Sequence, residues 1–180
     1  PMENTKVFVG SSIISAYFTP YSNFYPSKTY SDPENPGQNL VYQNIFNQIL
    51  PYIENAGKSI RILAYSLTDP VFISTLKTAS LRKIPIKIMI DQSQFLSSSN
   101  QTQSQLRDLG NSTTLKICQP PNEGLLHHKA IWIDHKILMA GSFNFIQNAR
   151  QPNDENFLII ENADTLTEGF EREMDQITPY

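Results

Sequence analysis

One stretch of the chain combines the residue types needed for chemistry on a phosphate group. An imidazole can act as nucleophile or proton carrier, and an ammonium can bind anionic phosphate oxygens. A hydroxyl and an amide add neutral hydrogen-bond donors. These groups occur together in the pattern His127-x-Lys129-x4-Asp134-x6-Gly141-Ser142-x-Asn144. If the fold brings them together, they form a site suited to a phosphate ester.

A β-hairpin is the element expected to position these groups. Lys129 to Asp134 has the composition of a buried strand, in which successive side chains point to opposite faces. His127 and Lys129 therefore share one face, and His128 and Trp132 share the other. A tight turn at His135-Lys136 is predicted to return the chain along 137–140. This return brings Gly141, Ser142 and Asn144 towards the start of the first strand, with Gly141 allowing a turn of the backbone.

Strand and helix patterns alternate along the rest of the chain. Asp69 and Pro70 mark a helix start, because an aspartate caps the first turn and proline suits the first helical position. Strands are predicted at 7–18, 59–66, 85–91, 115–118 and 156–161, and helices at 40–56, 69–82 and 164–177. This order predicts an α/β fold, a single domain over 1–180 with a mixed, largely parallel β-sheet flanked by helices.

Two segments interrupt this pattern. Residues 19–39 hold four prolines and several aromatic residues, and are predicted to form a long irregular loop. Loops of this length in compact domains are often functional. This one either serves function, with aromatic rings that could stack on bases, or simply packs on the surface. Residues 93–105 are rich in Ser, Gln and Asn and are predicted to be a flexible loop that enters a short helix ending at Gly110.

Composition excludes several classes of protein. The chain has 180 residues, 39% of them hydrophobic and 17% charged, which excludes a wholly disordered chain. Its single cysteine excludes an intrachain disulfide and a four-cysteine zinc site. No apolar run approaches the about 20 residues of a membrane helix, so no stable membrane insertion is expected from this segment. The net charge of -3 provides no global basic field, since residues 151–180 carry eight acidic residues and one arginine.

The six fixed positions of the pattern resemble the HKD motif of the phospholipase D superfamily. Two further features are similar to the small single-motif bacterial endonucleases of that superfamily, which act as homodimers. The segment IRILAYSLTDP at 60–70 resembles the strand and turn before their first helix. Glu155 follows Ser142 by 13 residues, where those nucleases place a motif glutamate. The resemblance covers about residues 40–178, and the loop at 19–39 departs from the shortest members.

The resemblance implies a metal-independent phosphodiesterase that uses no cofactor. His127 would attack phosphorus to form a phosphohistidine, and Lys129 and Asn144 would hold the phosphate oxygens. Ser142 would bind phosphate or lie just behind it. Glu155 would hydrogen-bond a ring nitrogen of His127 and so fix its tautomer.

Two motif positions are interpreted as structural. The strand pattern points Asp134 away from His127 and places it at the hairpin turn. Gly141 serves the backbone at the end of the returning strand.

The mechanism of the family needs two motif histidines, whereas this chain has one His-x-Lys sequence. The resemblance therefore implies a two-fold homodimer, in which the second His127 protonates the leaving oxygen at one composite site.

Three functions follow from these features. The first is a non-specific endonuclease that cleaves DNA, or RNA. The alternative is a phospholipase D-type hydrolase of phospholipid headgroups, although the segment has no amphipathic basic helix for a membrane surface. The third is a binding domain that has lost the reaction, which the intact motif disfavours. Related small nucleases are often exported, which favours a periplasmic or secreted location with a leader outside this sequence.

Overall fold

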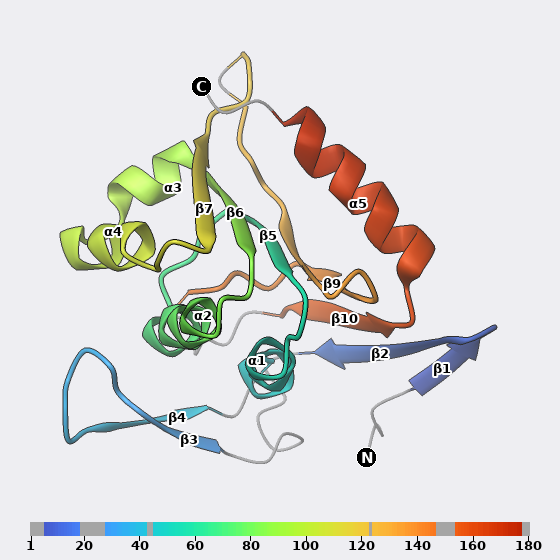
Figure 1. Ribbon diagram of the computed structural model, residues 1–180, viewed down its shortest axis with the longest axis horizontal. Coiled ribbons are helices and arrows are strands. Elements are labelled where there is room, and N and C mark those ends of the chain that lie inside the picture. Colours follow the sequence, from blue (N-terminus) through green and yellow to red (C-terminus); the bar gives the residue numbers. More distant parts are fainter. Residues whose placement is uncertain (1–5, 19–27, 43–44, 123, 147–153, 178–180) are drawn as a thin grey trace.

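The computed structural model describes residues 6–18, 28–42, 45–122, 124–146 and 154–177. An eight-stranded sheet lies at its centre, in the order β1-β2-β10-β9-β8-β5-β6-β7 (Figure 1). Its strands are β1 (Lys6–Val9), β2 (Ser12–Phe18), β5 (Ile60–Ala64), β6 (Ile86–Asp91), β7 (Thr113–Cys118), β8 (Lys129–Ile133), β9 (Ile137–Gly141) and β10 (Asn156–Glu161).

The predicted class, a mixed α/β sheet flanked by helices, is confirmed. Parallel pairing is nevertheless limited to β5 with β6 and β6 with β7. The other neighbouring strands of this sheet pair antiparallel, which corrects the expectation of a largely parallel sheet. Short turns permit only antiparallel pairing of β1 with β2 and of β8 with β9, whereas the pairs of β2 with β10 and of β5 with β8 join strands that are distant in the chain, which local patterns do not reveal.

Helices cover both faces of the sheet (Figure 1). α1 (Phe46–Glu54) and α2 (Pro70–Leu81) pack on the face that carries Ile131 and Ile133. α5 (Asp164–Gln176) packs on the opposite face, where Met174 and Trp132 belong to one buried cluster. The alternation predicted for β8 is therefore confirmed. No helix in the described ranges has both the length and the apolar character to cross a membrane.

The predicted start of α2 is confirmed by its cap. The side chain of Asp69 accepts a hydrogen bond from the N–H of Phe72 at 2.8 Å, and Pro70 is the first helical residue. Asp69 is fully buried, so this bond also satisfies a carboxylate that water cannot reach.

Three predictions in the N-terminal part of the chain, each of which treated a long segment as one element, are corrected by the structure. The strand expected at 7–18 is a hairpin of β1 and β2, which turns at Gly10 with a φ of 61°. The irregular loop expected at 19–39 contains β3 (Lys28–Ser31), and the helix expected from Leu40 begins only at α1. β3 pairs instead with β4 (Asn39–Tyr42), a partner that helical spacing cannot reveal. Residues 19–27 lie outside the described residues.

The prediction of a flexible loop at 93–105 is wrong, because two short helices occupy these residues, although the second corresponds to the short helix expected before Gly110. They are α3 (Gln92–Ser97) and α4 (Asn100–Arg107). Each has a side-chain cap: Asp91 accepts from the N–H groups of Ser93 and Gln94, and Ser99 accepts from Thr102. Phe95 and Leu106 anchor the helices in the core. Capping and two apolar anchors thus override a polar composition.

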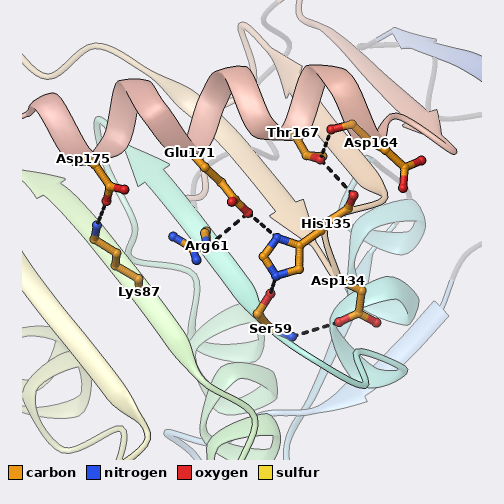
Figure 2. Close-up of polar contacts among 9 residues, drawn as sticks. All are labelled: Ser59, Arg61, Lys87, Asp134, His135, Asp164, Thr167, Glu171 and Asp175. Carbon is orange, nitrogen blue, oxygen red and sulfur yellow. Dashed lines mark hydrogen bonds and ion pairs between the residues drawn. The ribbon is translucent and has the colours of Figure 1, made fainter.

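Polar contacts attach α5 to the sheet beneath it (Figure 2). Glu171 on α5 lies 2.6 Å from Nδ1 of His135 and 3.4 Å from Nε of Arg61. One turn further on, Asp175 pairs with Lys87 at 2.6 Å. These pairs give the acidic C-terminal helix a fixed register on β5, β6 and the β8–β9 turn. They lie away from the face that carries Lys129.

Candidate active site

Several strand ends meet at one edge of the sheet and position the motif residues. In the strand registers Ala64, near the end of β5, lies opposite Lys129 at the start of β8. The end of β9 at Gly141 lies opposite Phe157 near the start of β10. The hairpin therefore brings the start and the end of the motif to the same edge, as its sequence predicts.

His127 and Lys129 are in direct contact at this edge. The Nζ atom of Lys129 lies 3.3 Å from both ring nitrogens of His127 and donates to the main-chain oxygen of His127 at 2.9 Å. His127 is exposed, whereas Lys129 is buried, with only 7% of its surface accessible. An accessible imidazole thus sits directly beside a cation, which is the pairing that an anionic substrate needs.

Burial lowers the pKa of Lys129, and the negative charge of Glu155 opposes that effect. Glu155 follows residues 147–153, which are outside the described part, and directly precedes β10. The hydrogen bond predicted between Glu155 and His127 stays a prediction.

Ser142 and Gly141 join the motif to β10. The N–H of Ser142 donates to the main-chain oxygen of Asn156 at 2.9 Å, and the Ser142 hydroxyl accepts from the N–H of Asn156 at 3.0 Å. A Cβ atom added at Gly141 would overlap the same Asn156 oxygen. Gly141 is therefore required because β9 and β10 approach each other closely here. This is a different reason from the backbone turn expected from the sequence. The two hydrogen bonds with Asn156 fix Ser142 against β10, and its contact with phosphate stays a prediction.

Asn144 is held between two anchored aromatic residues. Phe143 and Phe145 are both buried, and the ring of Phe145 stacks on that of Phe72 with the ring centroids 5.2 Å apart. The main-chain oxygen of Phe145 accepts from the N–H groups of Thr68 and Asp69. The side-chain oxygen of Asn144 is buried without a hydrogen-bond partner among the described residues. The anchored residues on either side thus fix the position of the Asn144 backbone, and donation from its Nδ2 group to a phosphate oxygen stays a prediction.

Two site residues escaped sequence reasoning. Tyr65 places its ring 4.6 Å from that of His127, and Asp91 accepts from the N–H of Leu126 at 2.8 Å. Asp91 is buried and also caps α3, so one carboxylate ties that helix to the residue before His127. Asp91 could have been noticed in the sequence, because it is an acidic residue at the end of a predicted buried strand. Tyr65 lies within the IRILAYSLTDP segment, but its contact is tertiary.

Asp134 occupies the turn between β8 and β9, and its carboxylate binds a different part of the chain. It accepts from the N–H groups of Gly57, Lys58 and Ser59 at 2.9, 2.7 and 3.0 Å. Burial raises its pKa, but these hydrogen bonds outweigh burial and hold the pKa below the usual value. These contacts agree with the structural interpretation. Asp134 and His135 have φ of 57° and 59°, so they are the central turn residues, not His135-Lys136.

We expect Asp134→Asn to destabilise the protein by about 2 kcal/mol at pH 7, because the charged acceptor of three hydrogen bonds becomes neutral. Asparagine tolerates a positive φ, so the turn itself is preserved. The carboxylate is favoured in the folded state, so its contribution is present above the unfolded pKa of about 4 and fades as pH falls through the lower folded value. Urea unfolding of both proteins between pH 7 and pH 3 measures the difference. A pH-independent difference would contradict this role.

The side chains of the other two histidines are not part of this cluster. His128 points to the α5 face, where burial lowers its pKa and the charge of Glu173 opposes that effect. His135 contacts Glu171, as described above. In the described ranges, no three His, Cys, Asp or Glu side chains are grouped so that they could hold a metal ion.

The fold and the motif geometry define a domain of the phospholipase D superfamily, the class to which the sequence pattern pointed. The family model described as "Cardiolipin synthase, PLD-like domain" matches residues 49–178. The chain belongs to this PLD-like domain family, and so to a superfamily of enzymes that act on phosphodiester bonds.

Relatives and solved structures agree with this assignment. A phospholipase D of Rickettsia bellii is 33% identical over 116 residues, which are 64% of this chain and 55% of the relative. The chain thus spans about half the length of the curated phospholipases D that it matches. Among solved structures, the phospholipase D family member Nuc of Salmonella typhimurium has a TM-score of 0.70 and 24% identity, covering 94% of this chain and 99% of Nuc. NucT of Helicobacter pylori also has a TM-score of 0.70, with 20% identity, covering 94% of this chain and 100% of NucT.

Proposed function

We propose that this protein is a metal-independent phosphodiesterase that cleaves DNA without sequence specificity, with RNA as a secondary substrate. The observation that carries the proposal is the contact between exposed His127 and the buried cation of Lys129 at one sheet edge. A nucleophile and a phosphate-binding cation fixed this close suit an in-line attack on phosphorus.

The reaction proceeds in two steps at a composite site. Nε2 of His127 attacks phosphorus, a phosphorus–nitrogen bond forms, and the bond to the leaving oxygen breaks. The partner subunit's His127 donates a proton to that oxygen. It then takes a proton from water, which attacks the phosphohistidine and releases the phosphate monoester. Lys129 and Asn144 hold the non-bridging oxygens, and the positive charge of Lys129 takes the place of a divalent ion.

This mechanism requires a homodimer, because one chain supplies one motif histidine. Sedimentation is expected to report about twice the monomer mass of 20.5 kDa. DNA is favoured as substrate because the motif, the segment at 60–70 and the position of Glu155 resemble the small single-motif bacterial endonucleases of the superfamily.

The second candidate is a hydrolase of phospholipid headgroups. Its support is the name of the Rickettsia relatives, phospholipase D, at 33–34% identity. The same residues would perform the same chemistry, with a different leaving group.

Digestion of plasmid and single-stranded DNA in excess EDTA separates these candidates. The dimer is expected to cleave both DNAs, and a His127→Ala dimer is expected to cleave neither. If a folded dimer leaves DNA and RNA intact but releases headgroups from phosphatidylcholine or cardiolipin vesicles, the second candidate replaces the first. Dependence of cleavage on added metal would contradict the proposed mechanism.

A further inference from the structure

Tyr65 contacts three consecutive residues at the start of the motif, 127–129. It follows β5 directly, and its N–H donates to the main-chain oxygen of His128 at 2.7 Å. Its ring lies 4.6 Å from the His127 ring, at an angle of 55°. The Nζ atom of Lys129 lies 4.9 Å from the centre of the same ring. One half-buried aromatic ring thus contacts both the proposed nucleophile and the proposed phosphate cation.

These contacts matter because His127 is exposed. An exposed side chain changes rotamer within picoseconds to nanoseconds, and only some rotamers point a ring nitrogen at phosphorus. A tilted aromatic neighbour at this distance favours one ring orientation. The same ring attracts the lysine ammonium by a cation–π interaction. Tyr65 therefore restricts both groups at once.

The ring of Tyr65 is itself held from outside the motif. Its hydroxyl accepts from Nε2 of Gln94 at 3.0 Å, and the N–H of Gln94 donates to Asp91 at 3.2 Å. The other oxygen of Asp91 accepts from the N–H of Leu126. α3 thus supports the tyrosine ring and the start of the motif through one buried carboxylate.

We propose that Tyr65, oriented by Gln94, is the positioning residue that holds the His127 ring and the Lys129 ammonium in their reactive arrangement. The claim rests on the proposed function, since it assigns a role within that same site. Tyr65 acts through His127 and Lys129 and takes no part in bond making. The competing role is a platform on which a substrate base stacks.

The kinetic test uses bis(p-nitrophenyl) phosphate, a small phosphodiester with no base to stack, in excess EDTA. Tyr65→Leu is expected to lower kcat on the order of 100-fold, with KM changed less than about 3-fold, because misplacement of a reacting group has effects of this size. Tyr65→Phe keeps the ring and is expected to retain kcat within about 10-fold. Gln94→Leu frees the hydroxyl and is expected to match Tyr65→Phe. Unchanged kcat in Tyr65→Leu overturns the proposal.

A matched control is Tyr52→Phe, which removes a tyrosine hydroxyl bonded to Glu161 at 3.0 Å, at the far end of β10. Its kcat is expected to equal that of the unchanged protein. A loss confined to KM on DNA in Tyr65→Leu, with normal turnover of the small substrate, would assign Tyr65 to base stacking and overturn positioning.

A second measurement does not depend on activity. The chain has three histidines, so NMR of the histidine rings gives three sets of signals, of which His127 is assigned with His127→Ala. Its ring protons are expected to show an upfield ring-current shift that disappears in Tyr65→Leu and persists in Tyr65→Phe. If the shift is absent from the unchanged protein, the positioning claim is wrong. If the shift is present but no phosphodiester is cleaved, the proposed function fails while the arrangement stands.

Discussion

Replacing His127 with alanine is expected to reduce phosphodiester cleavage about 10^4-fold or more, while the fold and the dimer persist. In the proposed composite site, this variant loses both the nucleophile and the group that protonates the leaving oxygen. His127 is exposed and not part of either buried cluster, so its removal leaves packing almost unchanged. Cleavage of DNA and of bis(p-nitrophenyl) phosphate in EDTA measures the loss, with circular dichroism and sedimentation as checks on structure.

The neighbouring residue supplies the matched control. His128 points to the opposite face, so His128→Ala is expected to retain cleavage within a few-fold of the unchanged protein. Mixed dimers sharpen the experiment further, because a composite site needs both histidines. A dimer with one His127→Ala subunit is expected to be as inactive as the double variant. Half of the original activity in purified mixed dimers would mean that each subunit works alone and would refute the composite site.

Replacing Lys129 with methionine is expected to reduce kcat by about 10^2- to 10^3-fold, because removal of one preorganised donor at a developing charge has effects of this order. Methionine matches the length of the buried stem, and Lys129 is 7% exposed, so the site stays filled. The effect is expected on a small phosphodiester as well as on DNA, since the charge acts on phosphorus-bound oxygens. A rate assay at saturating substrate in EDTA measures it.

Lys136→Met is the control for overall charge. Lys136 is exposed at the far end of the β8–β9 hairpin, so its loss changes net charge equally but leaves the site intact. Its kcat on the small substrate is expected to stay unchanged. Equal losses in the two variants would assign the role of Lys129 to long-range attraction of the substrate, against direct phosphate binding.

Local patterns in the sequence were sufficient where the deciding interactions are short-range. The alternation of side chains in β8 follows from strand geometry, so it correctly separated Lys129 from Trp132. The cap at Asp69 and the strand at 156–161 depend on a few consecutive residues, and both are confirmed. The structural interpretation of Asp134 also came from its position beside a tight turn. These features need no knowledge of distant partners.

Only tertiary structure decided which segments pair and what surrounds the motif. β3 pairs with β4, and α3 replaces an expected loop, because backbone pairing and buried anchors outweigh local composition. The contact of Tyr65 with His127 joins residues far apart in the chain, and it exists because β5 lies beside β8. The sequence by itself determined the chemical groups and the face that they share. The fold decided which residues surround them. The alternation of side chains along a strand tells which face each one points to, whereas its contacts depend on which strands become neighbours.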